Sequence, residues 1–135
     1  MAPRFTLLDH PSDVGIIVHG RDQQELFANA AFGLFALITD PATVRPQVPV
    51  AVSVGSKDLG ELMVNWLNEL IYLEDARKML FSEFRITKLT GQQLEAIALG
   101  EPIDLARHPL NRAVKAATYN QLQVGPKEAK IVFDV

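Results

Sequence analysis

The sequence predicts an α+β domain built as a two-layer sandwich, in which two amphipathic helices pack on one face of a mixed β-sheet. Three observations predict it. Two apolar stripes recur at helical spacing, several shorter segments alternate apolar and polar residues, and 135 residues is the size of one domain. We find no linker, internal repeat or low-complexity segment, so residues 1–135 are expected to form a single domain.

Composition excludes several classes of protein. Lys and Arg total 13 and Asp and Glu total 16, which gives a net charge of −3, whereas a free-standing nucleic-acid binder usually has a basic excess. The absence of cysteine excludes a disulfide scaffold, a zinc–thiolate site and a thiol nucleophile. The N-terminal residues lack the apolar core of a signal peptide, and no apolar run approaches the ~18 residues of a membrane span. We expect a cytoplasmic protein without a membrane partner.

The first elements follow from apolar alternation and helix-start signals. Strands are expected at Phe5–Leu8 and Val14–His19. A helix is expected to begin at Asp22, because a capping Asp followed three residues later by Glu25 satisfies amides of the first turn. Asp40-Pro41 should end this helix, since a residue before proline disfavours helical geometry.

The middle of the chain repeats this strand-then-helix pattern. Val48 to Val54 alternate as a half-buried strand, and Pro49, which lacks an amide donor, predicts that the strand lies at an edge. A second helix is expected from Asp58 to Arg77-Lys78, where the cations suit the negative C-terminal end of the helix.

The rest of the chain is expected to be strands and one loop. Residues 81–89 and 93–99 should form a hairpin around Thr90-Gly91, and residues 100–112 should form a loop with two prolines. A long strand is expected at 114–124, and a closing strand at 130–135.

The segment from Asp9 to Asp13 is the densest polar cluster before a strand. It holds two carboxylates and the imidazole of His10 within five residues. Hard cations prefer oxygen ligands, so this loop could contribute to a cation site. The alternative is a turn in which Asp and Ser side chains bond to the local backbone.

Asp134 stands out in the apolar closing strand. Alternation places it on the face opposite to Phe133 and Val135. Its carboxylate lies beside the free α-carboxylate of Val135, and two negative charges so close together favour a bound cation. The alternative is an exposed terminal strand with fraying charges.

The local basic cluster of the chain is formed by Arg107, His108, Arg112 and Lys115. It could meet an anion, RNA or an acidic partner, or it could be a solvated loop. We take His10, His108, Arg112 and Lys115 as candidates for partner binding or activation. The sequence has no nucleotide-binding glycine fingerprint, HExxH motif or Ser-His-Asp order, so its motifs do not predict an enzyme.

Five segments in order along the chain resemble the archease family, and the resemblance covers nearly the whole sequence. The segments are Asp9–Ile16, Glu25–Ala31, Trp66–Leu73, Val114–Tyr119 and Phe133–Val135. Archeases are small α/β proteins that assist RtcB-type RNA ligases in tRNA splicing. The resemblance implies a metal-dependent activator that promotes guanylylation and multiple turnover of the ligase, in tRNA splicing or RNA repair, and that meets RNA only through the ligase.

The resemblance also implies a site. The family's metal ligands match Asp13, Asp134 and the chain-end carboxylate of Val135, and a functional lysine of the family matches Lys115. Because all of these metal ligands are oxygens, the cation is expected to be Ca²⁺, Mg²⁺ or Mn²⁺. The sequence carries no signal for the oligomeric state.

Two positions depart from the family pattern. Asn120 stands where His is frequent, and Asn65 stands where Asp is frequent. An amide supplies neither imidazole basicity nor a carboxylate charge, so these two roles do not carry over.

Two other functions compete with ligase activation. A small metal-dependent hydrolase would use a water bound to the cation, but few candidate bases accompany Asp13 and Asp134. A general chaperone or interaction module would use an incompletely covered sheet face.

Overall fold

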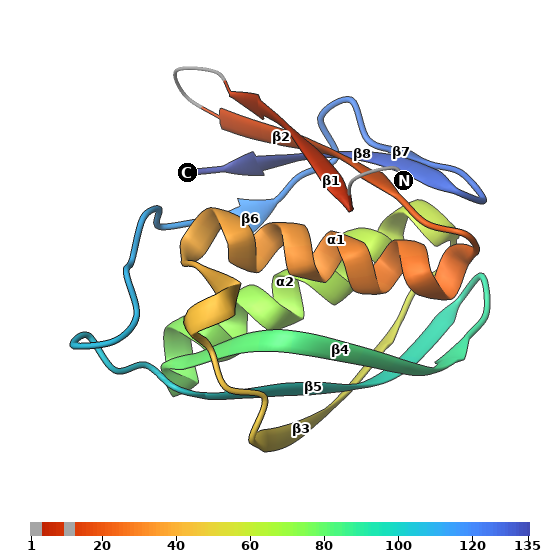
Figure 1. Cartoon of the computed structure of the whole chain (residues 1–135). Coiled ribbons are helices and arrows are strands. Elements are labelled where there is room, and N and C mark those ends of the chain that lie inside the picture. Colours follow the sequence, from red (N-terminus) through yellow and green to blue (C-terminus); the bar gives the residue numbers. More distant parts are fainter. Residues whose placement is uncertain (1–3, 10–12) are drawn as a thin grey trace.

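The computed structural model describes residues 4–9 and 13–135 and confirms the α+β class (Figure 1). Within these residues, two long helices lie between two β-sheets. The elements are β1 (Phe5–Asp9), β2 (Asp13–His19), α1 (Gln23–Ile38), a 3₁₀ turn (Pro41–Thr43), β3 (Val48–Gly55), α2 (Leu59–Arg77), β4 (Met79–Leu89), β5 (Gln93–Pro102), β6 (Ala116–Ala117), β7 (Gln123–Val124) and β8 (Glu128–Asp134). No helix in the described ranges is long and apolar enough to cross a membrane.

The strands form two antiparallel sheets rather than the single mixed sheet that we expected. One sheet has the order β1-β2-β8-β6, with β7 also paired to β8, and the other has the order β3-β5-β4. The two helices contact both sheets. The reason is visible in α1, which is buried around most of its circumference, so one sheet could cover only part of its apolar surface.

Both predicted helix starts are confirmed by their caps. Asp22 Oδ1 accepts a hydrogen bond from the backbone N–H of Glu25 at 2.8 Å, and Asp58 Oδ1 accepts one from Glu61 at 2.8 Å. Each cap satisfies an amide that has no partner inside its helix. The expected end of the first helix before Asp40-Pro41 is confirmed as well.

The core between the sheets is centred on aromatic side chains. Trp66 is fully buried, and its indole N–H donates to the carbonyl oxygen of Phe27 at 3.0 Å, which joins α2 to α1. Phe35 packs edge-on against Phe81 with ring centroids 5.6 Å apart. Both helix stripes therefore face the core, as their spacing predicted.

The expected long strand at 114–124 is wrong, because the chain turns in its middle. Two short strands, β6 and β7, flank a turn at Asn120 and Gln121, where Gln121 has a φ of 52° and Leu122 N–H donates to Tyr119 O at 3.2 Å. Both short strands pair with β8, at different points along it. The left-handed backbone falls on Gln121 rather than on a Gly or Asn, so the sequence gave no local signal for that position.

Candidate functional site

Asp13 and Asp134 lie directly opposite each other in the antiparallel pair of β2 and β8. Their neighbours Val14 and Phe133 are fully buried against the helices, so alternation turns both carboxylates to the outward face of the sheet. Side chains at directly opposed positions have Cβ atoms about 4.5–5.5 Å apart, and like charges there are destabilising. The expected meeting of these two strand ends is observed.

Lys115 is joined to the same strand end through its backbone. Its N–H donates to the carbonyl oxygen of Asp134 at 2.8 Å, and the next residue, Ala116, pairs with Asp134. The Lys115 side chain is exposed and lines a groove of about 490 Å³ between α2 and the 113–116 segment. Glu74 also lines this groove, and partial burial, together with the neighbouring charge of Asp75, raises the pKa of Glu74.

Asn68 of α2 holds this segment in place. Its Oδ1 accepts a hydrogen bond from the backbone N–H of Ala117 at 2.8 Å, and its Nδ2 donates to the carbonyl oxygen of Ala117 at 3.4 Å. One amide side chain thus satisfies both backbone groups of a residue in a two-residue strand. Sequence reasoning did not single out Asn68, although it lies in a segment of the family resemblance.

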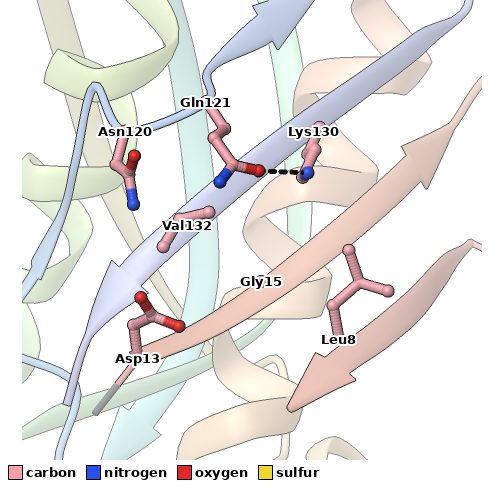
Figure 2. A pocket seen from close by; sticks show the side chains of 7 residues that line it. All are labelled: Leu8, Asp13, Gly15, Asn120, Gln121, Lys130 and Val132. Atoms are coloured by element: carbon pink, nitrogen blue, oxygen red, sulfur yellow. Dashed lines mark hydrogen bonds between the residues drawn. The ribbon is translucent and has the colours of Figure 1, made fainter. Parts of the chain in front are cut away.

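A pocket of about 260 Å³ opens on the outward face beside Asp13 (Figure 2). It is lined by Leu8, Asp13, Gly15, Asn120, Gln121, Lys130 and Val132. Lys130 Nζ donates to Gln121 Oε1 at 2.6 Å, at the end of the pocket away from Asp13. Sequence reasoning missed both residues, but alternation along the closing strand puts Lys130 on the face of Asp134 and could have found it.

The two departures from the family pattern fall in different places. Asn120 lines the pocket together with Asp13, so the substitution changes the chemistry of this face. Asn65 instead lies on α2, where its Nδ2 donates to the carbonyl oxygen of Gly55 at 2.9 Å and fastens the end of β3 to the helix.

The structure corrects the expectation that His108 meets a partner. Its side chain is buried, its Nε2 lies 3.0 Å from Glu101 Oε2, and its Nδ1 accepts the backbone N–H of Asp104 at 2.9 Å. Because Nδ1 is an acceptor, the proton is on Nε2 and is donated to Glu101. His108 therefore connects Asp104 to Glu101 inside the protein.

The carboxylate of Glu101 is the centre of that buried network. Hydrogen bonds from the Arg107 guanidinium, from the backbone N–H of Arg45 and from His108 lower the pKa of Glu101 from 4.5 to about 2. Arg107 of the predicted basic cluster therefore forms an ion pair within the protein, with Glu101.

The remaining candidates are placed as follows. Arg112 is half-buried in the segment between β5 and β6, and His10 lies outside the described residues. Val135 is half-buried and directly follows Asp134.

The donor set at the paired carboxylates fits part of the coordination shell of a hard cation. Among the side chains that the structure describes, which do not include that of Asp9, no three His, Cys, Asp or Glu residues gather closely enough to hold a metal by themselves. Ca²⁺ and Mg²⁺, however, commonly complete their shells with backbone oxygens and water. Asp13 and Asp134 are the residues that would hold the ion.

Comparisons with known proteins agree with this architecture. The family model of the archease protein family matches residues 5–135. A protein archease from Methanosarcina barkeri is 34% identical, covering 98% of this chain and 96% of the relative, and one from Sulfolobus acidocaldarius is 30% identical, covering 96% and 94%.

Solved structures share the fold. The solution structure of Methanobacterium thermoautotrophicum protein 1598 has a TM-score of 0.81 and 29% identity, and covers 98% of this chain and 99% of that one. A crystal structure from Thermotoga maritima, described as an archease and possible chaperone, has a TM-score of 0.62 at 16% identity, covering 95% and 94%. The match along almost the entire sequence, together with this shared fold, shows that the chain belongs to the archease family.

Proposed function

We propose that this chain activates an RtcB-type RNA ligase in tRNA splicing or RNA repair, by promoting guanylylation of the ligase and its multiple turnover, with the help of a divalent cation. The observation that carries the proposal is the pairing of Asp13 with Asp134, to whose carbonyl oxygen Lys115 is hydrogen-bonded. These are the three side chains that the family resemblance marks as functional, and they come from three separate strands or strand ends.

The chemistry of this strand end supports an accessory role. A divalent cation would neutralise the paired carboxylates and present positive charge on an exposed face. Lys115 adds a positive charge close to the same strand end, where its exposed side chain lines the groove beside α2. A net charge of −3 supports contact with RNA through the ligase rather than directly.

A ligase assay with matched carboxylate variants tests the proposal. Purified RtcB-type ligase is given GTP and a cleaved RNA, and guanylylation and multiple turnover are followed with wild type, Asp13→Asn or Asp134→Asn. The control is Glu128→Gln, which removes a carboxylate from the same face at the other end of β8. We expect the two Asp variants to lose activation and the control to keep it.

Three further measurements separate the competing functions. Calorimetric titration of Ca²⁺, Mg²⁺ and Mn²⁺ should give binding to wild type and to Glu128→Gln, but not to the Asp variants. Full activation by Asp13→Asn and Asp134→Asn would overturn the proposal. Phosphodiester hydrolysis by the chain alone would favour a hydrolase, and protection of unrelated aggregating proteins would favour a chaperone.

A further inference from the structure

The pocket on the outward face combines positive and negative groups, which a ligand of one charge sign cannot satisfy together. Lys130 supplies an ammonium group and Gln121 an amide at one end, while Asp13 supplies a carboxylate at the other end, on the side where the Asn120 amide lies (Figure 2). Three hydrogen-bond donors favour an oxyanion, but the carboxylate repels one. A ligand that carries both an oxyanion and a cation resolves this conflict.

The amide orientation in the pocket is set by one contact. Gln121 Oε1 accepts from Lys130 Nζ at 2.6 Å, so the amide nitrogen of Gln121 is directed away from Lys130, towards the pocket (Figure 2). Donors from two residues are therefore held in position before a ligand arrives, which lowers the entropic cost of binding. Gly15 adds no side chain to the bottom of the pocket, where a Cβ atom would contact Leu8.

The spacing of the charges selects the length of the ligand. Asp13 pairs with Asp134, and Lys130 lies four residues earlier on β8, which corresponds to about 13–14 Å along a strand. With the backbone positions of the two charged residues this far apart, a di- or triphosphate is better suited than a single phosphate to reach from a cation at Asp13 to Lys130.

We propose that this pocket binds a di- or triphosphate chelated to a divalent cation, with the cation at Asp13 and the phosphate chain on Lys130, Gln121 and Asn120. The inference rests on the cation site of the proposed function and adds a ligand to it. No aromatic side chain lines the pocket within the part of the chain that the structure describes, so binding should not depend on a nucleotide base.

Calorimetry with Mg²⁺ and inorganic pyrophosphate tests the pocket. Pyrophosphate should bind wild type in the presence of Mg²⁺ and not in its absence, and inorganic phosphate should bind more weakly. Lys130→Gln should weaken pyrophosphate binding about tenfold, because a charged hydrogen bond is lost, while leaving Mg²⁺ affinity unchanged. Lys130→Arg should restore binding. The matched control is Lys127→Gln, which removes an exposed charge from the turn before β8.

The outcomes separate this inference from the proposed function. If Mg²⁺ binds but pyrophosphate does not, or if Lys130→Gln binds pyrophosphate like wild type, the inference is overturned and ligase activation is untouched. If wild type binds no divalent cation, the cation requirement fails first and the inference fails with it. ATP and GTP distinguish the source of the phosphate chain. Equal affinities fit the pocket, and a preference for one base would contradict it.

Discussion

The backbone N–H of Lys115 donates to the carbonyl oxygen of Asp134 across 2.8 Å, so the two residues are joined independently of their side chains. This contact holds the backbone from which the Lys115 side chain projects, and the ammonium group takes no part in it. The side chain can therefore be changed while the strand end is kept, which allows function and folding to be measured separately.

Replacing Lys115 by Ala should reduce ligase activation about tenfold or more, the typical effect of losing a charged hydrogen bond to a partner. Stability should change by less than about 0.5 kcal/mol, because the side chain is exposed. Activation kinetics and urea unfolding measure the two effects. Lys88→Ala, which removes an exposed lysine from the other sheet, is the control. Wild-type activation by Lys115→Ala would remove this residue from the site.

Asn68→Ala should loosen the strand that carries Lys115. The variant leaves the N–H and the carbonyl oxygen of Ala117 without their amide partner, a loss of about 1–3 kcal/mol in unfolding free energy. Hydrogen exchange should accelerate at residues 115–117 more than in α1. Uniform acceleration over the whole molecule would show that Asn68 stabilises the fold without positioning this segment.

Trp66→Ala should lower the free energy of unfolding by about 3–5 kcal/mol, because a large, fully buried side chain is deleted from the core. Trp66→Phe should cost less, since it keeps much of the packing and loses the hydrogen bond to Phe27. Denaturant unfolding with both variants checks this order. A loss below about 1 kcal/mol for the Ala variant would contradict the packing of α2.

The buried Glu101 should make stability depend on acid pH. Its pKa is lowered from 4.5 to about 2 in the folded protein, so the ionised form contributes stability above pH 4.5, and this contribution is lost as the pH falls towards 2. Glu101→Gln should therefore be less stable than wild type at pH 7, and the difference should shrink between about pH 5 and pH 2. Thermal unfolding across this range tests it, and a constant difference would refute the assignment.

Local signals in the sequence were enough for the helices and most strands. Caps such as Asp22 and Asp58 act within one turn, and the alternation around Val14 reports burial directly. Alternation does not say which strands pair, so the division into two sheets could not be predicted. The turn at Gln121 escaped for a related reason, since its left-handed backbone is held by tertiary pairing of both flanking strands with β8.

In the candidate site, too, local sequence patterns did not show which residues contact each other. The family resemblance pointed to Asp13 and Asp134, and the sheet register explains how they meet. The environment of His108 could not be predicted, because its burial depends on Glu101, which lies seven residues earlier and also binds Arg107 and Arg45. A histidine in a loop with two prolines gives no local sign of such a network.

The position of β2 between β1 and β8 has a consequence for synthesis on the ribosome. Asp13 and Asp134 are more than 100 positions apart in the sequence, so β2 leaves the ribosome long before its second partner exists. During that interval one edge of β2 exposes unpaired backbone groups, which can template pairing with another chain. Asp13 and Asp134 come together only when β8 pairs with the free edge of β2. Nascent chains that stop short of β8 should therefore be both inactive and prone to aggregation.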